Sequence, residues 1–226
     1  MNNILITGGS GFIGRSLIKL AVDNGFCVRA TVRKLPLNKL TGVKYVVVKD
    51  INSSTDWSAA LHGINIVVHC AGRAHMSKKI NREEISLINE ANLNGVANLA
   101  KQALENDVNR FIFLSSIGVL GDYASIDNPM TENSAYAPSN PYSHSKMMAE
   151  LRLLDICNGS KMSLTVIRPP MVYGPGAPGN FKSLKRLVML RLPLPFASID
   201  NIRSFVSINN LCHFIMTCIN SVNSAH

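Results

Sequence analysis

The sequence predicts a doubly wound α/β fold, in which helices cover both faces of a parallel sheet. Three observations support this prediction. Short β-rich runs alternate with longer amphipathic runs along the chain. The short runs are apolar throughout, as in Val46-Val47-Val48 and Phe111 to Leu114, which is typical of strands buried on both faces. A glycine-rich segment, Gly8 to Gly14, directly follows the first run, where a strand would turn tightly into a helix.

The individual elements follow from the local pattern in order along the chain. Strands are expected near 2–7, 27–33, 43–48, 65–70, 110–115 and 163–168, where the β-rich runs lie. Helices are expected between them, and the longest candidates span about 83–106 and 141–158. In the first candidate, apolar residues recur at helical spacing, at Ile85, Ile88, Ala91, Leu99, Ala103 and Leu104.

The pattern changes after residue 168. Prolines and glycines punctuate the chain from Pro169 to Gly179, which indicates the end of the main domain. We therefore expect a first domain at 1–168 and a small second lobe at 169–226. The strand and helix expected near 202–221 should pack back on the first domain.

Composition narrows the class of protein. A chain of 226 residues with 46% hydrophobic and 16% charged residues is typical of a globular protein with a sizeable core. The net charge of +9 favours acidic partners, but the basic residues are scattered, so no nucleic-acid partner is expected. The sequence shows neither a secretory signal nor an apolar run of membrane-spanning length. We expect a cytoplasmic protein without obligatory membrane contact.

The glycine-rich segment TGGSGFIG at 7–14 predicts a dinucleotide site, because it lies between an expected strand and an expected helix. Gly8 would permit the tight turn, Gly11 would let backbone N–H groups approach a pyrophosphate, and Gly14 would allow close helix–strand packing. The alternative is a tight turn without a ligand. The residues assigned to this turn of the site are Gly8, Gly11, Phe12, Ile13 and Gly14.

The ends of the second and third strands bear on the choice of cofactor. NAD sites usually place a carboxylate on the ribose at the end of the second strand, but this sequence has Arg33 near that position. A guanidinium suits a 2′-phosphate, so we expect NADP. NAD is the alternative, in which Arg33 is only a solvated loop cation. Asp50 ends the third strand and could accept a hydrogen bond from the adenine amino group, or simply form a turn.

Candidate catalytic groups lie in two places, at the start of the 141–158 helix and at the end of the fifth strand. Tyr142 and Lys146 are four residues apart, which places them on one helical face. A neighbouring ammonium and a nicotinamide cation would favour the phenolate form and suit Tyr142 to acid–base work. Ser115 and Ser116 lie at the end of a strand, where open α/β sheets bind ligands. Either hydroxyl could bind the reacting oxygen, or act only as a cap.

Together these segments resemble the extended short-chain dehydrogenase/reductases, the NAD(P)-dependent nucleotide-sugar epimerases and dehydratases. The matching motifs occur in family order over nearly the whole chain: TGGSGFIG, Asp50-Ile51, HCAG at 69–72, Asn92 in NLNG, LSSIGVLG, PYSHSK and RPPMVYGPG. The resemblance implies an NAD(P)-binding Rossmann fold. Family members usually continue well beyond residue 226, so we expect 169–226 to form only part of a substrate lobe.

The resemblance also implies roles for individual residues. Tyr142 would be the acid/base, Lys146 its activator and ribose anchor, and Ser116 the hydroxyl that polarises the substrate. Asn92 would be structural. Further cofactor contacts are implied at Ile51, Ala71, Gly72 and Pro169, the last in a segment with Arg168 that lines the nicotinamide pocket. Substrate contacts are implied at Ser116, Tyr142, Asn180 and Arg203, and the Arg203 guanidinium would clamp a diphosphate.

Two positions depart from the family pattern. Leu120 stands where a tyrosine is usual, and Tyr142 is followed by Ser143-His144 where a small residue is common. Neither departure removes a catalytic group. His69 and His75 share no chelating spacing with each other, with His144 or with an acidic or cysteine partner, so no metal site is expected.

The resemblance leads to one preferred function and two alternatives. The preferred function is an NADP-dependent 4-keto-reductase that acts on a UDP-linked sugar in surface-polysaccharide synthesis, because LPLPFASIDNIRSFV resembles reductases that make UDP-N-acetylquinovosamine. The first alternative is a UDP-sugar 4-epimerase of the UDP-glucose 4-epimerase kind. The second is a non-catalytic dinucleotide-sensing or scaffold module. A homodimer is expected, because the family commonly dimerises through helices equivalent to 83–106 and 141–158.

Overall fold

The computed structural model describes residues 2–74, 81–178, 180–190 and 202–221. Its main sheet is six-stranded, with every strand parallel to its neighbours, in the order β3-β2-β1-β4-β5-β6. The strands are β1 (Asn3–Thr7), β2 (Cys27–Val32), β3 (Val43–Val47), β4 (Ile66–His69), β5 (Arg110–Leu114) and β6 (Ser163–Ile167). This strand order is that of the Rossmann fold, so the predicted doubly wound class is confirmed.

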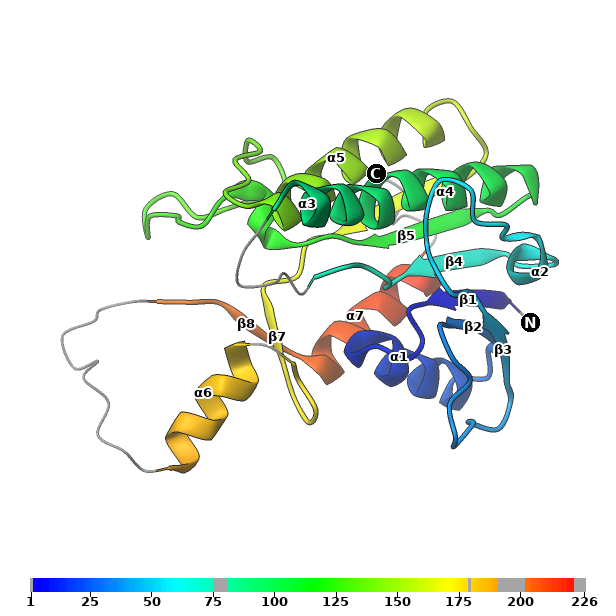
Figure 1. The fold of residues 1–226 in the computed structure, drawn as a ribbon, viewed down its shortest axis with the longest axis horizontal. Coiled ribbons are helices and arrows are strands. Elements are labelled where there is room, and N and C mark those ends of the chain that lie inside the picture. The colour runs from blue at the N-terminus through cyan, green and yellow to red at the C-terminus, as the bar shows by residue number, and fades with distance from the viewer. Residues whose placement is uncertain (1, 75–80, 179, 191–201, 222–226) are drawn as a thin grey trace.

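Helices cover both faces of the sheet (Figure 1). One face carries α1 (Phe12–Asp23) and α7 (Ile208–Asn220), and the other carries α3 (Arg82–Asn89), α4 (Gly95–Glu105) and α5 (Pro141–Cys157), with the short α2 (Ser58–Leu61) at its edge. Each face therefore has its own apolar core, one around Leu17 and Ile215 and the other around Trp57 and Leu99.

The helix expected over 83–106 is not uniform. The π-helical turn η1 (Glu90–Asn94) connects α3 to α4. Such turns occur mostly as single insertions within α-helices, frequently at functional sites. The periodicity of Ile85, Ile88 and Leu99 indicated a helix here, but hydrophobic spacing carries no signal for one extra residue in a turn. The helix expected over 141–158 is α5.

The chain after residue 168 divides between the core and a projecting part. The strands β7 (Met171–Tyr173) and β8 (Phe205–Ser207) form a separate parallel pair, and α6 (Asn180–Met189) projects from the sheet (Figure 1). Helix α7 instead shares the core of α1, and the Arg110 guanidinium donates to the carbonyl oxygens of Cys218 and Ile219 at 2.7 and 2.9 Å. The division into a domain at 1–168 and a partial lobe at 169–226 stays a prediction.

No helix in the described part of the chain combines the length and the apolar character that a bilayer crossing requires.

Candidate active site

The glycine-rich turn forms a tight backbone cradle between β1 and α1. Gly8 has a φ of +68°, and a Cβ on it would lie 2.9 Å from the backbone N and Cα of Ala71. A Cβ on Gly14 would overlap the carbonyl oxygen of Gly8. Helix α1 begins after Gly11, which supplies no capping side chain, so the first N–H groups of the helix suit an anion. The cradle therefore fits a pyrophosphate.

A cavity of about 420 Å³ opens beside this cradle, at the carboxyl ends of the strands. Seven of the predicted cofactor residues line it: Gly8, Gly11, Arg33, Asp50, Ile51, Ala71 and Gly72. Other residues line it as well, among them Cys70 and Glu90, to which the sequence had assigned no cofactor contact. The residues present fit a dinucleotide, because Gly8 and Gly11 line the cavity without side chains and the uncapped start of α1 follows them directly.

Buried hydrogen bonds hold the end of β4 against β1 at this cavity. The Thr7 Oγ1 lies 3.0 Å from His69 Nδ1 and accepts from the Ala71 N–H at 3.2 Å. Burial, with the nearby charge of Lys146, lowers the pKa of His69 to about 3, so this imidazole is neutral. Among the described residues no group of three or more His, Cys, Asp or Glu side chains gathers as a metal site would require, and His75 lies outside them.

Tyr142 and Lys146 both lie in the first turns of α5. Asn140 caps this helix by accepting from the Ser143 N–H at 2.9 Å, and Pro141 occupies its first position. Tyr142 is half-buried, and burial raises the pKa of its phenol. The expectation that Lys146 and the cofactor lower this pKa stays a prediction.

Lys146 is buried beside the cavity wall. Its Nζ donates to the Leu114 carbonyl at 2.8 Å and lies 4.5 Å from the centre of the Phe113 ring. A Cβ on Gly72, which lines the cavity, would lie 3.4 Å from the same Nζ. Burial lowers the pKa of Lys146 to about 8, and interactions with Cys70 and Glu150 oppose this shift. The ammonium therefore lies where β5, α5 and the cavity wall meet.

The pH dependence of the free energy of unfolding should report the lowered pKa of Lys146. Because burial lowers the pKa of Lys146 to about 8, the unfolded chain binds one more proton than the folded chain between pH 8 and the ordinary lysine pKa of about 10.4. Lys146 should therefore contribute a rise in the free energy of unfolding with pH across this window, with a slope of at most about 1.4 kcal/mol per pH unit, whereas the buried cysteines, whose pKa values are raised, contribute with the opposite sign. Urea unfolding at several pH values should show a less positive slope for Lys146→Met than for Lys101→Met, since Lys101 is exposed. Equal slopes would contradict the shift.

Burial separates the two candidate serines. Ser115 is buried, and its Oγ contacts no hydrogen-bonding partner among the described residues. Ser116 is half-exposed and begins the 3-10 turn η2 (Ile117–Leu120), where its Oγ accepts from the Gly118 N–H at 3.2 Å. A Cβ on Gly118 would lie 2.6 Å from the Ser143 Oγ. This turn therefore packs against the first turn of α5. The Ser116 hydroxyl proton meets no acceptor in the described part of the chain.

Asn92 connects η1 to α5. Its Oδ1 accepts from the Arg73 N–H at 2.8 Å, and its Nδ2 donates to the Ser145 Oγ at 3.0 Å. Ser145 in turn donates to the Tyr142 carbonyl at 2.7 Å. The buried amide thus ties the segment after β4 to the turn that carries Tyr142, which fits the structural role implied by the family resemblance.

Arg168 and Pro169 take part in contacts within the fold. The Arg168 guanidinium binds the buried Glu150 carboxylate, with a shortest distance of 2.7 Å, and donates to the Tyr136 hydroxyl at 2.9 Å. Pro169 accepts from the Ile117 N–H through its carbonyl at 3.1 Å. Neither residue lines the cavity beside the glycine turn. The cofactor role implied for Pro169 stays a prediction.

The two predicted substrate residues lie after residue 168. Arg203 is exposed, just before β8, and lies outside the lining of the cavity beside the glycine turn. Asn180 begins α6, and its side chain lies outside the described part of the structure. Their roles as substrate contacts stay predictions.

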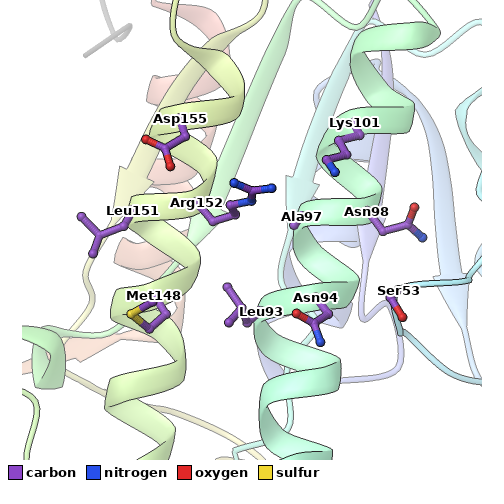
Figure 2. Close-up of a pocket in the computed structure, with 10 residues that line it drawn as sticks. All are labelled: Ser53, Leu93, Asn94, Ala97, Asn98, Lys101, Met148, Leu151, Arg152 and Asp155. Carbon is purple, nitrogen blue, oxygen red and sulfur yellow. The ribbon is translucent and has the colours of Figure 1, made fainter.

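A second cavity, of about 470 Å³, lies between η1–α4 and α5. Figure 2 shows Arg152 of α5 and Lys101 of α4 pointing into the space between the helices, whereas the Asp155 carboxylate points to the side of α5 away from α4. Met148 and Leu151 contribute apolar lining. None of the predicted catalytic residues lines this cavity.

Comparisons with known proteins agree on one family. The model of the NAD dependent epimerase/dehydratase family matches residues 4–226. The UDP-glucose 4-epimerase of Vibrio cholerae is 44% identical over 226 residues, which cover 99% of this chain and 68% of that protein. The N-acetyl-alpha-D-glucosaminyl-diphospho-ditrans,octacis-undecaprenol 4-epimerase of Escherichia coli O157:H7 is 28% identical, over 100% of this chain and 65% of that protein. The chain thus spans about two thirds of the length of these relatives.

A solved structure shares the fold at lower identity. The UDP-glucuronic acid 4-epimerase of Bacillus cereus, in complex with UDP-glucuronic acid and NAD, has a TM-score of 0.82 at 19% identity, covering 99% of this chain and 74% of that chain. This similarity supports the Rossmann-like architecture.

Proposed function

The chain belongs to the NAD-dependent epimerase/dehydratase family, whose members are enzymes of the extended short-chain dehydrogenase/reductase type, and from this premise we propose that it acts at carbon 4 of a UDP-linked sugar as a 4-epimerase. The observation that carries the proposal is the 44% identity to a UDP-glucose 4-epimerase over 99% of the chain. The presence of Ser116, Tyr142 and Lys146 at the family positions supports it.

The residues of the site suggest how the protein contributes to this reaction. Gly8, Gly11 and the start of α1 would hold the pyrophosphate of the cofactor, and Asp50 its adenine. A bound NAD supplies a hydride acceptor that becomes a hydride donor in the reverse step. Tyr142 would take the proton of the sugar 4-hydroxyl and return it to the same oxygen, while the free hydroxyl proton of Ser116 binds that oxygen as charge develops.

Lys146 would assist Tyr142 by its charge. A cation on the same helical face favours the phenolate over the phenol, and so opposes the effect of burial on the pKa of Tyr142. Because the pKa of Lys146 itself is lowered to about 8, most of these amines are protonated at neutral pH.

A 4-keto-reductase that consumes NADPH is the second candidate. Arg33 favours it, because this exposed guanidinium lines the cavity at the end of β2, where a 2′-phosphate would bind. The NAD in the solved structure of the Bacillus cereus 4-epimerase supports the first candidate instead. The E. coli relative named for an undecaprenol-linked sugar supports a role in surface-polysaccharide synthesis for either.

One set of assays separates these functions. Purified protein is incubated with UDP-glucose and NAD, and separately with a UDP-4-keto-6-deoxy-sugar and NADPH. The proposal expects formation of UDP-galactose without net change in cofactor absorbance. Stoichiometric consumption of NADPH by the keto-sugar, without epimerisation, would replace it with the reductase. If thermal shifts report dinucleotide binding but neither reaction occurs, the non-catalytic module is favoured.

We also propose a homodimer formed through the α4–α5 face. Met148, Leu151 and Leu154 of α5 are exposed apolar side chains on one helix. Arg152 and Asp155 lie beside them at the second cavity (Figure 2), so a two-fold axis could pair opposite charges between copies. Sedimentation velocity gives the oligomeric state.

A further inference from the structure

A row of polar side chains follows one stripe of the helix formed by η1 and α4. Its members recur every fourth residue, a spacing that keeps side chains on one helical face. Three of them bond to the segment that follows β3, at 50–57, and the fourth bonds to its neighbour in the row. We call this row the polar ladder. It consists of Glu90, Asn94, Asn98 and Gln102.

Glu90, the first residue of the polar ladder, binds Ser53 at two points. One carboxylate oxygen of Glu90, Oε1, accepts from the Ser53 N–H at 2.8 Å and from the Ser53 hydroxyl at 2.7 Å. The other oxygen, Oε2, accepts from the Asn94 Nδ2 at 2.6 Å. These bonds lower the pKa of Glu90, with Asn94 as the largest contributor. Bonds to an ionised carboxylate are stronger than neutral ones, so Glu90 holds Ser53 more firmly than a neutral side chain would.

Asn98 and Gln102, the last two residues of the polar ladder, bind other parts of the 50–57 segment. Asn98 donates through Nδ2 to the Asn52 and Thr55 carbonyls at 3.2 and 2.8 Å. Gln102 donates to the same Thr55 carbonyl at 2.8 Å and accepts from the Trp57 N–H at 2.8 Å. The backbone of the segment is thereby fixed along the helix.

Close packing fixes the segment where it meets the cofactor cavity. A Cβ on Gly95 would lie 2.5 Å from the Ile51 Cγ2 and 2.9 Å from the Asn52 N. The wall formed by Asp50, Ile51 and Asn52 therefore lies directly against the helix backbone at Ile51 and Asn52. The same three residues and Glu90 line the cavity beside the glycine turn. Displacing the ladder would displace this wall.

Glu90 and Asn92, both in the π-helical turn, bind segments on opposite sides of the cavity. Glu90 binds Ser53 on the side of the wall, whereas Asn92, two residues later, binds Arg73 and Ser145 on the side of the catalytic helix. Such turns are frequent at functional sites. The two halves of the cavity are thus held from a single turn, through separate side chains.

We propose that Glu90 is a positioning residue for the adenosine half of the dinucleotide, which it controls by fixing the wall of Asp50 to Asn52 through Ser53. The proposal rests on the proposed dinucleotide site. It predicts that loss of Glu90 weakens the binding of every ligand that contains the adenosine half. The helix α5, held by Asn92, should stay unchanged.

The test compares Glu90→Ala with Glu105→Ala. Glu105 is an exposed glutamate of α4 that forms no hydrogen bond or ion pair with the described residues, so it controls for the loss of a charge from the same helix. Isothermal titration with ADP-ribose and with NAD should show about tenfold weaker binding of both ligands by Glu90→Ala, about 1.4 kcal/mol. Binding of UDP and the melting temperature should change little. The Ser53 amide should exchange its hydrogen faster, and the fluorescence of Trp57, the single tryptophan, should report the loosened segment.

Glu90→Gln provides the conservative rescue. A glutamine oxygen can still accept from Ser53, while its NH₂ group faces the Asn94 amide, so its affinity for ADP-ribose should lie between those of the parent protein and Glu90→Ala. If the parent protein binds neither ADP-ribose nor NAD, the proposed dinucleotide site fails. If the parent binds both and the Glu90 variants bind as tightly as Glu105→Ala, the site stands and the role of Glu90 is overturned. Equal loss of ADP-ribose and UDP binding in Glu90→Ala and Glu90→Gln would also overturn it, because that pattern reports general unfolding.

Discussion

Replacement of Tyr142 by phenylalanine is expected to lower kcat by about 10²- to 10⁴-fold, the contribution typical of a positioned acid–base group. The substitution removes only the phenolic oxygen and keeps the half-buried ring, so the first turn of α5 should retain its packing. Dinucleotide affinity should change little, because the glycine cradle is untouched. Steady-state kinetics with the substrate identified by the assays above, together with titration of NAD, measures both effects.

Tyr123→Phe is the matched control for this experiment. Tyr123 is 88% exposed and lies in the segment before α5, so the same chemical change there should leave kcat unaltered. A Tyr142→Phe variant that keeps more than a tenth of the parent kcat would contradict the assignment of Tyr142 as the acid/base. Equal losses in both variants would indicate a general effect of removing a tyrosine hydroxyl.

Replacement of Arg168 by methionine is expected to destabilise the fold by about 3–5 kcal/mol, the usual cost of leaving a buried charge without its partner. The Glu150 side chain is 1% exposed and its carboxylate binds the Arg168 guanidinium at 2.7 Å. Burial lowers the pKa of Arg168, but its bonds to Glu150 and Tyr136 raise it by more, so the cation is firmly held. For a chain of this size the melting temperature should fall by roughly 10 °C.

The double variant Arg168→Met, Glu150→Leu separates a lost ion pair from lost packing. Replacing both partners by apolar residues of similar volume removes the unpaired charge, and such replacements are often neutral. Most of the lost stability should therefore return, which urea unfolding of the three proteins can measure. An Arg168→Met variant as stable as the parent protein would show that the carboxylate is solvated or protonated in the fold.

The sequence predicted the main sheet well because parallel strands buried on both faces carry a strong local signal. The apolar runs around Ile66 and Phe111 became β4 and β5, and the turn at Gly8 to Gly14 became the start of α1. The sequence also placed Tyr142 and Lys146 on one face, since their spacing needs only a helix. The identity of the chain as a member of its enzyme family could be read from the same local motifs.

Other features of the site depend on contacts between distant segments, and no local pattern predicted them. The π-helical turn at Glu90 to Asn94 is one inserted residue within a continuous amphipathic helix, which hydrophobic periodicity does not detect. The polar ladder was visible only as a recurrence of polar residues, which is equally typical of a solvated helix face. Its partners lie more than thirty residues away in the chain, at Ser53 and Thr55.

The sequence by itself determined the strand–turn–helix cradle, the order of the motifs and the helical pairing of Tyr142 with Lys146, because each depends on neighbours within a few residues. Tertiary structure alone decided which of Ser115 and Ser116 keeps an accessible hydroxyl, where the Lys146 amine is bound and what the Arg168 guanidinium contacts. The physical reason is that burial, and the pKa shifts and hydrogen bonds that follow from it, are set by which distant segments pack together. The spacing of residues determines which side chains share a face of one helix or strand. The packing of several elements determines what those side chains contact and how deeply they are buried.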